Sequence, residues 1–134
     1  MVLPNPEKKN EITCPRTSAA AFRRLFARLI VTSGQLALAK DGSIPTDVRA
    51  QAELCFDYID AILAEAGADV SHVLRFSAYV TRREDMAAYM AARDARVAHL
   101  TAKPASTLVI VSGFTRPEFL VEVEALAFLP EMTS

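Results

Sequence analysis

Two glutamates, Glu122 and Glu124, lie in an apolar segment near the end of this 134-residue chain. Side chains two positions apart point to the same face of a β-strand, so a strand here would place both carboxylates on one side of its sheet. Such a carboxylate can orient water or act as a general acid or base, most effectively when partial burial raises its pKa toward neutrality. The alternative is that both carboxylates are solvated or ion-paired, because burying an unpaired charge is costly. The sequence leaves both interpretations open.

Ser106, at the start of another apolar segment, could be a nucleophile or a hydroxyl that contacts a ligand. A nucleophilic serine needs a base within reach. The two histidines, His72 and His99, are expected near the start of a strand and near the end of a helix, which argues against a Ser–His pair. No His, Cys, Asp and Glu residues show metal-ligand spacing, and no glycine-rich phosphate loop is present. We therefore expect no metal and no cofactor.

Gly34 interrupts a β-branched, apolar run from Leu29 to Ala39. A glycine within a strand marks a bulge or a close approach of another group to the backbone. Gly34 is therefore a candidate position at which another group contacts the main chain.

The composition is that of a folded domain, with 51% apolar and 23% charged residues. The length corresponds to one domain, and the apolar content exceeds what one small core needs, which suggests a subunit interface. The formal net charge of −1 argues against a nucleic-acid partner.

The two cysteines, Cys14 and Cys55, lie far apart without Cys-x-x-Cys spacing, so we expect two free thiols in a reducing compartment. No apolar stretch reaches the ~18 residues that span a bilayer, and the N-terminal residues lack the apolar core of a signal peptide. These features predict a cytoplasmic protein with no membrane partner.

Residues 1–12 are expected to form a flexible leader, and residues 13–134 a single domain. Pro4 and Pro6 interrupt regular structure in the leader. The segment from Thr17 to Ala27 fits either a helix or a strand, and we favour the strand. The structure of residues 13–28 stays open at this point.

Local sequence signals predict two helices. The first begins after the cap at Thr46–Asp47 and ends at Gly67, and its apolar residues recur with helical spacing. The second begins in the segment Thr81–Glu84, whose spacing matches a capping box, and ends before Pro104. The residues expected on the core side of these helices are Val48, Ala52, Cys55, Ile59, Ile62 and Ala66 in the first, and Met86 and Met90 in the second.

Four segments are expected to be strands: Leu29–Ala39, Val73–Val80, Ser106–Val111 and Leu120–Leu129. In the second segment, alternation predicts that Leu74, Phe76, Ala78 and Val80 face the core. The last two segments are predicted to pair as an antiparallel hairpin. The whole pattern predicts an α+β fold with both helices on one face of the sheet and a second subunit covering the other face.

Several segments together resemble the RidA/YjgF/YER057c/UK114 family: Val31–Gln35, the pattern Q-x7-I-x2-I-L-x2-A-G from Gln51 to Gly67, Pro104–Ala105, and Leu120–Ala127. The resemblance runs in order from Leu29 to Phe128. It implies a chorismate-mutase-like mixed β-sheet and a homotrimer with a barrel core. It also implies small-molecule pockets in the clefts between subunits and hydrolysis of reactive enamines and imines without metal or cofactor. Other members are labelled L-PSP-type endoribonucleases.

The resemblance also implies roles for particular residues. Gly34 matches the glycine whose backbone lines the pocket, and Glu122 matches the acidic residue that positions the attacking water. Ser106 and Thr107 fall within the substrate-binding motif, and Met90 takes the helix position that is asparagine in many members. Leu108 takes the motif's cysteine position, so the pocket is expected to be more apolar than in RidA.

Ser106 stands where the deaminating members carry an arginine that holds the substrate carboxylate through two parallel hydrogen bonds. A serine hydroxyl supplies one neutral hydrogen bond and no charge. An arginine elsewhere could replace that charge if its guanidinium reaches the same place. The candidates are Arg16, Arg75, Arg93 and Arg116, with Arg75 and Arg116 favoured by their expected exposure.

Two functions from different classes therefore remain open. One is hydrolysis of an imine or enamine, with Glu122 orienting water, Gly34 shaping the pocket and Ser106 contacting the ligand. The other is binding or sensing of a small metabolite without chemistry. An endoribonuclease activity is a third possibility that rests on the family label alone.

Overall fold

The computed structural model describes the backbone of residues 24–133 and the side chains of residues 27–130. The chain divides into two units, and the unit Ala27–Leu129 contains both helices and most of the sheet. The expected leader over residues 1–12, Cys14 and Arg16 lie outside the described residues. Of the segment whose structure the sequence left open, residues Arg24–Ala27 belong to a strand, as favoured.

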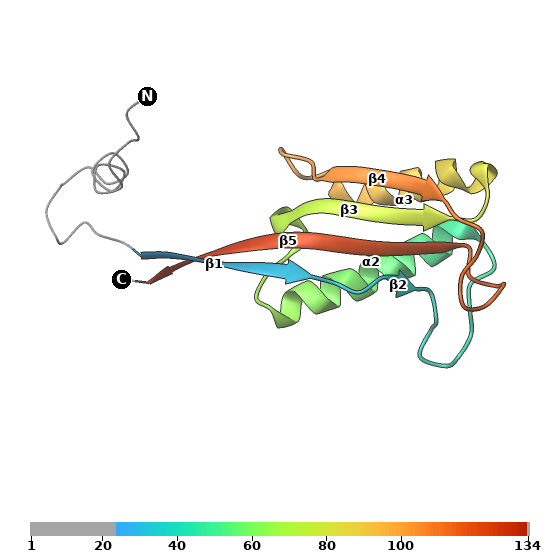
Figure 1. Ribbon diagram of the computed structural model, residues 1–134, viewed down its shortest axis with the longest axis horizontal. Helices are drawn as coiled ribbons and strands as arrows, with labels where there is room; N and C mark the ends of the chain where they lie inside the picture. Colours follow the sequence, from blue (N-terminus) through green and yellow to red (C-terminus); the bar gives the residue numbers. More distant parts are fainter. Residues whose placement is uncertain (1–23, 134) are drawn as a thin grey trace, which may run out of the picture. The chain divides into compact units, whose positions relative to one another are not determined.

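The described chain folds into one mixed sheet and two α-helices (Figure 1). The strands are ordered β1-β5-β3-β4, and the short β2 also pairs with β5. The elements run in the order β1 (Arg24–Val31), β2 (Gln35–Leu36), α2 (Val48–Glu65), β3 (Val73–Val80), α3 (Met86–Val97), β4 (Ala105–Ile110) and β5 (Val121–Thr133), with 3-10 turns at Val70–His72 and Arg83–Asp85. This is the α+β class that the sequence predicted.

The expected hairpin between the last two strands is wrong. Strand β4 pairs with β3 in parallel, and β5 pairs with β3 antiparallel, so β3 separates the last two strands. A connection through a helix returns the chain in the same direction, which makes β3 and β4 parallel. Strand β5, whose residues alternate between buried and half-buried, takes an inner position instead, and β4 forms the sheet edge.

Helix α2 begins and ends where the sequence predicted. The Asp47 carboxylate accepts a hydrogen bond from the Ala50 amide at 2.8 Å, and Gly67 after the helix has a φ of +78°. A left-handed conformation at this position suits glycine, because a Cβ there would be strained. The buried face contains four of the predicted residues, together with Gln51, Phe56 and Leu63.

Buried Gln51 connects α2 to the loop that leads into β5. Its amide nitrogen donates to the carbonyls of Pro45 and Glu118 at 2.7 and 2.8 Å, and its carbonyl accepts from the Leu120 amide at 2.9 Å. All of these groups are partly buried, so the bonds offset the cost of removing the amide from water. This connection fixes the start of β5, and therefore the position of Glu122.

The expected burial of Leu74 is wrong, because the pairing of β3 with β5 shifts register between Val73 and Arg75. The extra residue of this bulge turns Val73 toward the core and leaves Leu74 50% exposed. The remaining residues of the prediction, Phe76, Ala78 and Val80, are buried.

The predicted start of the second helix also needs correction. The helical segment is capped at Arg82, whose side chain makes no capping hydrogen bond, and a 3-10 turn precedes α3. Arg82 instead pairs with Asp85 at 3.0 Å. Met86 packs against the core as expected, but Met90 is 41% exposed and is not a core residue.

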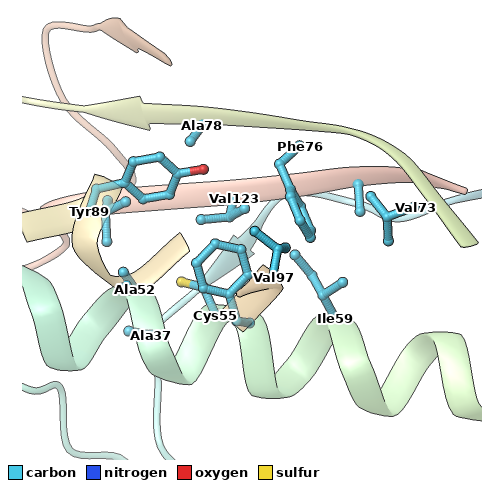
Figure 2. Packing of buried hydrophobic residues seen from close by; sticks show 14 of the residues in the cluster. Ala37, Ala52, Cys55, Ile59, Val73, Phe76, Ala78, Tyr89, Val97 and Val123 are labelled. Atoms are coloured by element: carbon cyan, nitrogen blue, oxygen red, sulfur yellow. The ribbon is translucent and has the colours of Figure 1, made fainter. Parts of the chain in front are cut away.

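The core fills the space between the two helices and one face of the sheet (Figure 2). The Phe56 ring of α2 meets Phe76 of β3 edge-on with centroids 5.1 Å apart, and stacks on Tyr89 of α3 at 6.0 Å. Because α2 and α3 both contribute to this one cluster, both helices cover the same face, as predicted. No helix in the described part of the chain is long and apolar enough to cross a bilayer.

Candidate functional site

The face of the sheet that points away from the helices carries a pair of carboxylates. Glu122 is opposite Tyr79, and Glu124 is opposite Ser77, in the antiparallel pairing of β5 with β3. The intervening residue, Val123, is buried in the core, so the two glutamates share the other face, as the period of two predicts. We call this face the open face, because the described helices lie on the other side.

Gly34 lies against the side chain of Glu122. A Cβ built at Gly34 would be 3.0 Å from the Glu122 Cγ, 2.6 Å from its Cδ and closer still to its Oε1. Gly34 sits in the break between β1 and β2, and β2 pairs Leu36 with Glu122. The missing side chain therefore leaves the space that the Glu122 carboxylate occupies, which is the close approach that the sequence predicted at this glycine.

The two carboxylates differ in their hydrogen bonds. The Tyr79 hydroxyl donates to the Glu124 Oε1 at 2.9 Å, and this bond raises the pKa of Tyr79. None of the described residues donates a hydrogen bond to Glu122. Burial raises the pKa of Glu122, and the neighbouring charge of Glu124 adds to the effect. A half-buried carboxylate with unused acceptor oxygens and a raised pKa is suited to binding water and exchanging a proton with it.

Ser106 lies on the opposite face of the sheet from Glu122. In the parallel pairing of β4 with β3, Ser106 is opposite Phe76, whose side chain is buried under the helices. The Ser106 hydroxyl accepts a hydrogen bond from the Arg93 Nη1 of α3 at 3.0 Å. Arg93 thus brings a guanidinium beside Ser106, the position at which the resemblance leads us to expect an arginine.

Arg93 is held from two further sides. Its Nε and Nη2 both donate to the Asp94 Oδ1, at 2.9 and 2.8 Å, and its guanidinium carbon lies 6.0 Å from the centre of the Tyr89 ring. The Tyr89 hydroxyl is buried and makes no hydrogen bond. Burial raises the pKa of Tyr89 to about 12, and the positive charge of Arg93 opposes this shift.

A cavity of about 330 Å³ opens between the end of α3 and the start of β4. Its lining combines two cations, a carboxylate, a hydroxyl and two apolar side chains, which belong to Arg93, Lys103, Asp94, Ser106, Val97 and Pro104. Of the predicted substrate-binding residues, Ser106 lines this cavity, whereas Met90 and Thr107 do not. Thr107 is opposite Ser77 and faces the open side of the sheet.

The other arginine candidates lie elsewhere. Arg75 is exposed and is opposite Ala105 and Leu126, away from Ser106. Arg116 lies 3.6 Å from the Glu118 carboxylate and over the Phe119 ring. Arg16 is outside the described residues. Among the described arginines, Arg93 is the one bonded to Ser106, although the sequence favoured Arg75 and Arg116.

Glu122 and Ser106 cannot form one site within a single chain. They point to opposite faces, and β3 lies between their strands. Their register positions also differ by three residues along the strands, so strand geometry puts their Cα atoms about 14 Å apart. A site that uses both residues needs them from two different chains.

Neither a metal site nor a reactive thiol is found in the described residues. No group of three or more His, Cys, Asp and Glu side chains in residues 27–130 could hold a metal ion. Cys55 is a free, buried cysteine, as predicted; its thiol donates to the Gln35 carbonyl at 3.1 Å. Burial raises the pKa of the Cys55 thiol to about 12, which keeps it protonated at neutral pH.

The sequence reasoning missed Tyr79, Tyr89 and Lys103 as neighbours of the candidate residues. One signal was available, because Tyr89 and Arg93 are four residues apart and therefore share a face of α3. The contact of that face with Ser106 depends on the packing of α3 against β4, which no local pattern reveals.

Comparisons with known proteins agree on one family. The model of the endoribonuclease L-PSP family matches residues 16–129. The 2-iminobutanoate/2-iminopropanoate deaminase of Escherichia coli (strain K12) is 33% identical over 104 residues, which cover 76% of this chain and 80% of that protein.

Solved structures give the same result. The Escherichia coli YjgF gene product superposes with a TM-score of 0.69 at 33% identity, covering 74% of this chain and 79% of that chain. Escherichia coli TdcF, solved with bound serine, has the same TM-score at 28% identity and the same coverage.

Proposed function

The chain belongs to the RidA/YjgF family, which the endoribonuclease L-PSP model describes, and we propose that it hydrolyses a small reactive imine or enamine. The observation that carries the proposal is the Glu122 carboxylate, half-buried on the open face, packed against Gly34 and without a donor among the described residues. A matched relative in Escherichia coli is named a 2-iminobutanoate/2-iminopropanoate deaminase, which supports the same reaction class.

Glu122 is the catalytic residue of this proposal. Its carboxylate takes a proton from a bound water as the water oxygen forms a bond to the imine carbon. The same carboxyl group then returns the proton to nitrogen, which gives a carbinolamine. The hydroxyl proton of the carbinolamine passes to the nitrogen as the carbon–nitrogen bond breaks, and the products are a carbonyl compound and ammonia. A raised pKa matches the carboxyl group to both transfers, since it must accept and then donate one proton near neutral pH.

The proposed site is completed by a second chain, because one chain keeps Glu122 and Ser106 on opposite faces. The open face carries exposed apolar side chains that a partner would cover: Leu29, Val31, Leu74, Val109 and Phe128. We propose a homotrimer with its sheets turned inward, as the family resemblance implies, and ligand clefts between chains. Native mass spectrometry should then give three times 14.6 kDa, about 44 kDa. A monomer at micromolar concentration would contradict this part of the proposal.

The reaction is tested by semicarbazide competition. An amino-acid oxidase generates imines from a panel of amino acids, semicarbazide traps them, and an active protein lowers the yield of trapped product. Glu122→Gln should lower the activity by at least about a hundredfold, because removing a general acid–base typically costs that much. Glu124→Gln is the comparison variant: Glu124 is bonded to Tyr79 and affects Glu122 only through its charge, so its loss should lower the activity much less than the loss of Glu122 does.

Two results would contradict the proposal: full activity in Glu122→Gln, or no activity of the unaltered protein on any imine in the panel. The second result favours the other candidate function, binding of a metabolite without chemistry. The observation in favour of that function is Ser106, which places a neutral hydroxyl where the deaminating members carry arginine. An endoribonuclease activity has only the family description in its favour, and the net charge of −1 argues against RNA binding.

A further inference from the structure

We propose that Arg93 is the carboxylate-binding residue of this protein, and that the cavity beside it takes small monocarboxylic acids with an aliphatic side chain. The cavity lies between the end of α3 and the start of β4 and measures about 330 Å³. The part of this inference that concerns catalysis rests on the proposed function, whereas carboxylate binding is measurable without turnover.

The guanidinium of Arg93 has unused donors. An arginine side chain carries five N–H groups. Three of them donate to described residues, two to the Asp94 Oδ1 and one to the Ser106 Oγ. The remaining two N–H groups are one on Nη1 and one on Nη2. Two N–H groups on the terminal nitrogens of one planar guanidinium can bind the two oxygens of a carboxylate.

The guanidinium is also held in place before a ligand arrives. The Arg93 side chain is only 20% exposed, and it lies between the Tyr89 ring, the Ser106 hydroxyl and Asp94. An ordered guanidinium loses less conformational entropy on binding, and partial burial reduces the screening of its charge by water. Asp94 is 65% exposed and accepts from Nε and Nη2 of Arg93, whereas Ser106 accepts from Nη1.

The charges around the cavity limit the ligand to one negative charge. Arg93 and Lys103 are positive and Asp94 is negative, so the lining has a net charge of +1. Lys103 donates to the carbonyls of Val97, Ala98 and Leu100 at the end of α3, which leaves Arg93 as the group free to bind an anion. A second carboxylate on the ligand would meet Asp94 and be repelled.

The remaining walls set the size and polarity of the ligand. Val97 and Pro104 contribute apolar surface, and 330 Å³ is at the small end of ligand cavities, which run from about 300 to 1,000 Å³. The lining therefore suits a short aliphatic group attached to the carboxylate. Stable 2-oxo acids meet this description and are the carbonyl products of imino-acid hydrolysis.

Binding is tested on the full chain by 1H–15N NMR titration with 2-oxobutanoate, and with 2-oxobutanamide as its neutral counterpart. We expect the acid to shift the Arg93 Nε–H and Ser106 amide signals, and the amide to bind at least about tenfold more weakly, since a hydrogen bond to a charged group is lost. Arg93→Met should weaken binding of the acid by a similar factor. The matched control is Arg49→Met, because Arg49 is an exposed α2 arginine paired with Glu53.

Arg93→Lys separates the effect of the positive charge from the effect of the two parallel donors. It keeps the positive charge but not the planar pair of donors, so its affinity for the acid should lie between those of the unaltered protein and Arg93→Met. Thermal melting of each variant verifies that it is folded. Equal affinity for acid and amide, or unchanged affinity in a folded Arg93→Met variant, would overturn the inference.

The semicarbazide assay distinguishes this inference from the proposed function. Arg93-dependent binding of 2-oxobutanoate without imine hydrolysis would reject the proposed function and leave the carboxylate site standing. Imine hydrolysis that is unaffected by Arg93→Met would reject the carboxylate site and leave the proposed function standing.

Discussion

Replacing Gly34 by alanine should displace the Glu122 carboxyl group without strain in the backbone. Gly34 does not have a positive φ, so alanine is compatible with its main-chain conformation. The new Cβ would lie 2.6 Å from the Glu122 Cδ, and an ordinary contact is about 3.4 Å. The carboxyl carbon must therefore retreat by about 0.8 Å, and the nearer oxygen by more than about 1 Å.

This displacement has two measurable consequences. A misplacement of about 1 Å in a catalytic group can cost about a hundredfold in rate, which corresponds to about 2.7 kcal/mol of transition-state stabilisation. Moving the Glu122 side chain off its preferred rotamer should lower the free energy of unfolding by about 0.5–1.5 kcal/mol. We expect kcat/KM in the imine assay to fall by about a hundredfold, and urea unfolding to show the smaller loss of stability.

A double-mutant cycle identifies the cause. In the Glu122→Ala background the obstructing side chain is absent, so Gly34→Ala should no longer lower the free energy of unfolding. Gly113→Ala is the control, because a Cβ there meets no atom within 4 Å and its φ is not positive. The reasoning is refuted if Gly34→Ala keeps full activity, or if its stability cost is the same with and without Glu122.

Two further predictions concern the stability of the fold. The raised pKa of Glu122 means that the folded state favours the protonated carboxyl group. The free energy of unfolding should therefore fall as the pH rises from about 4.5 through the folded-state pKa, because the carboxyl group ionises. Glu122→Gln should therefore melt at a higher temperature than the unaltered protein at pH 8 and at the same temperature below about pH 4; equal melting temperatures at pH 8 would refute this. Tyr89→Phe should raise the free energy of unfolding by about 1 kcal/mol in urea titrations, because it removes a buried hydroxyl without a partner and keeps the ring stacked on Phe56. A loss of stability in Tyr89→Phe would mean that this hydroxyl is satisfied in solution.

Local chemistry made parts of the fold predictable. The Asp47 cap and the left-handed Gly67 bound α2 because each acts on backbone groups within a few residues. The shared face of Glu122 and Glu124 follows from the two-residue period of a strand, whatever the strand pairs with. The family resemblance also came from the sequence, since it depends on the order and spacing of motifs.

Contacts between distant segments were decided by the tertiary structure. The bulge that exposes Leu74 arises from the register of β3 against β5, and the parallel placement of β4 from the way α3 packs. The hydrogen bond between Arg93 and Ser106 joins a helix to a strand edge, so the sequence could name Arg93 only as one of four candidates.

The sequence by itself determined the ends of α2, the shared face of Glu122 and Glu124 and the family, because these depend on interactions or motifs within a few positions. Only the tertiary structure decided that Glu122 fills the space left by Gly34, that Arg93 bonds to Ser106, and that these two pairs lie on opposite faces of one sheet. The physical reason is that strand order and helix packing are set by which arrangement buries the most apolar surface, a property of the whole chain rather than of any segment.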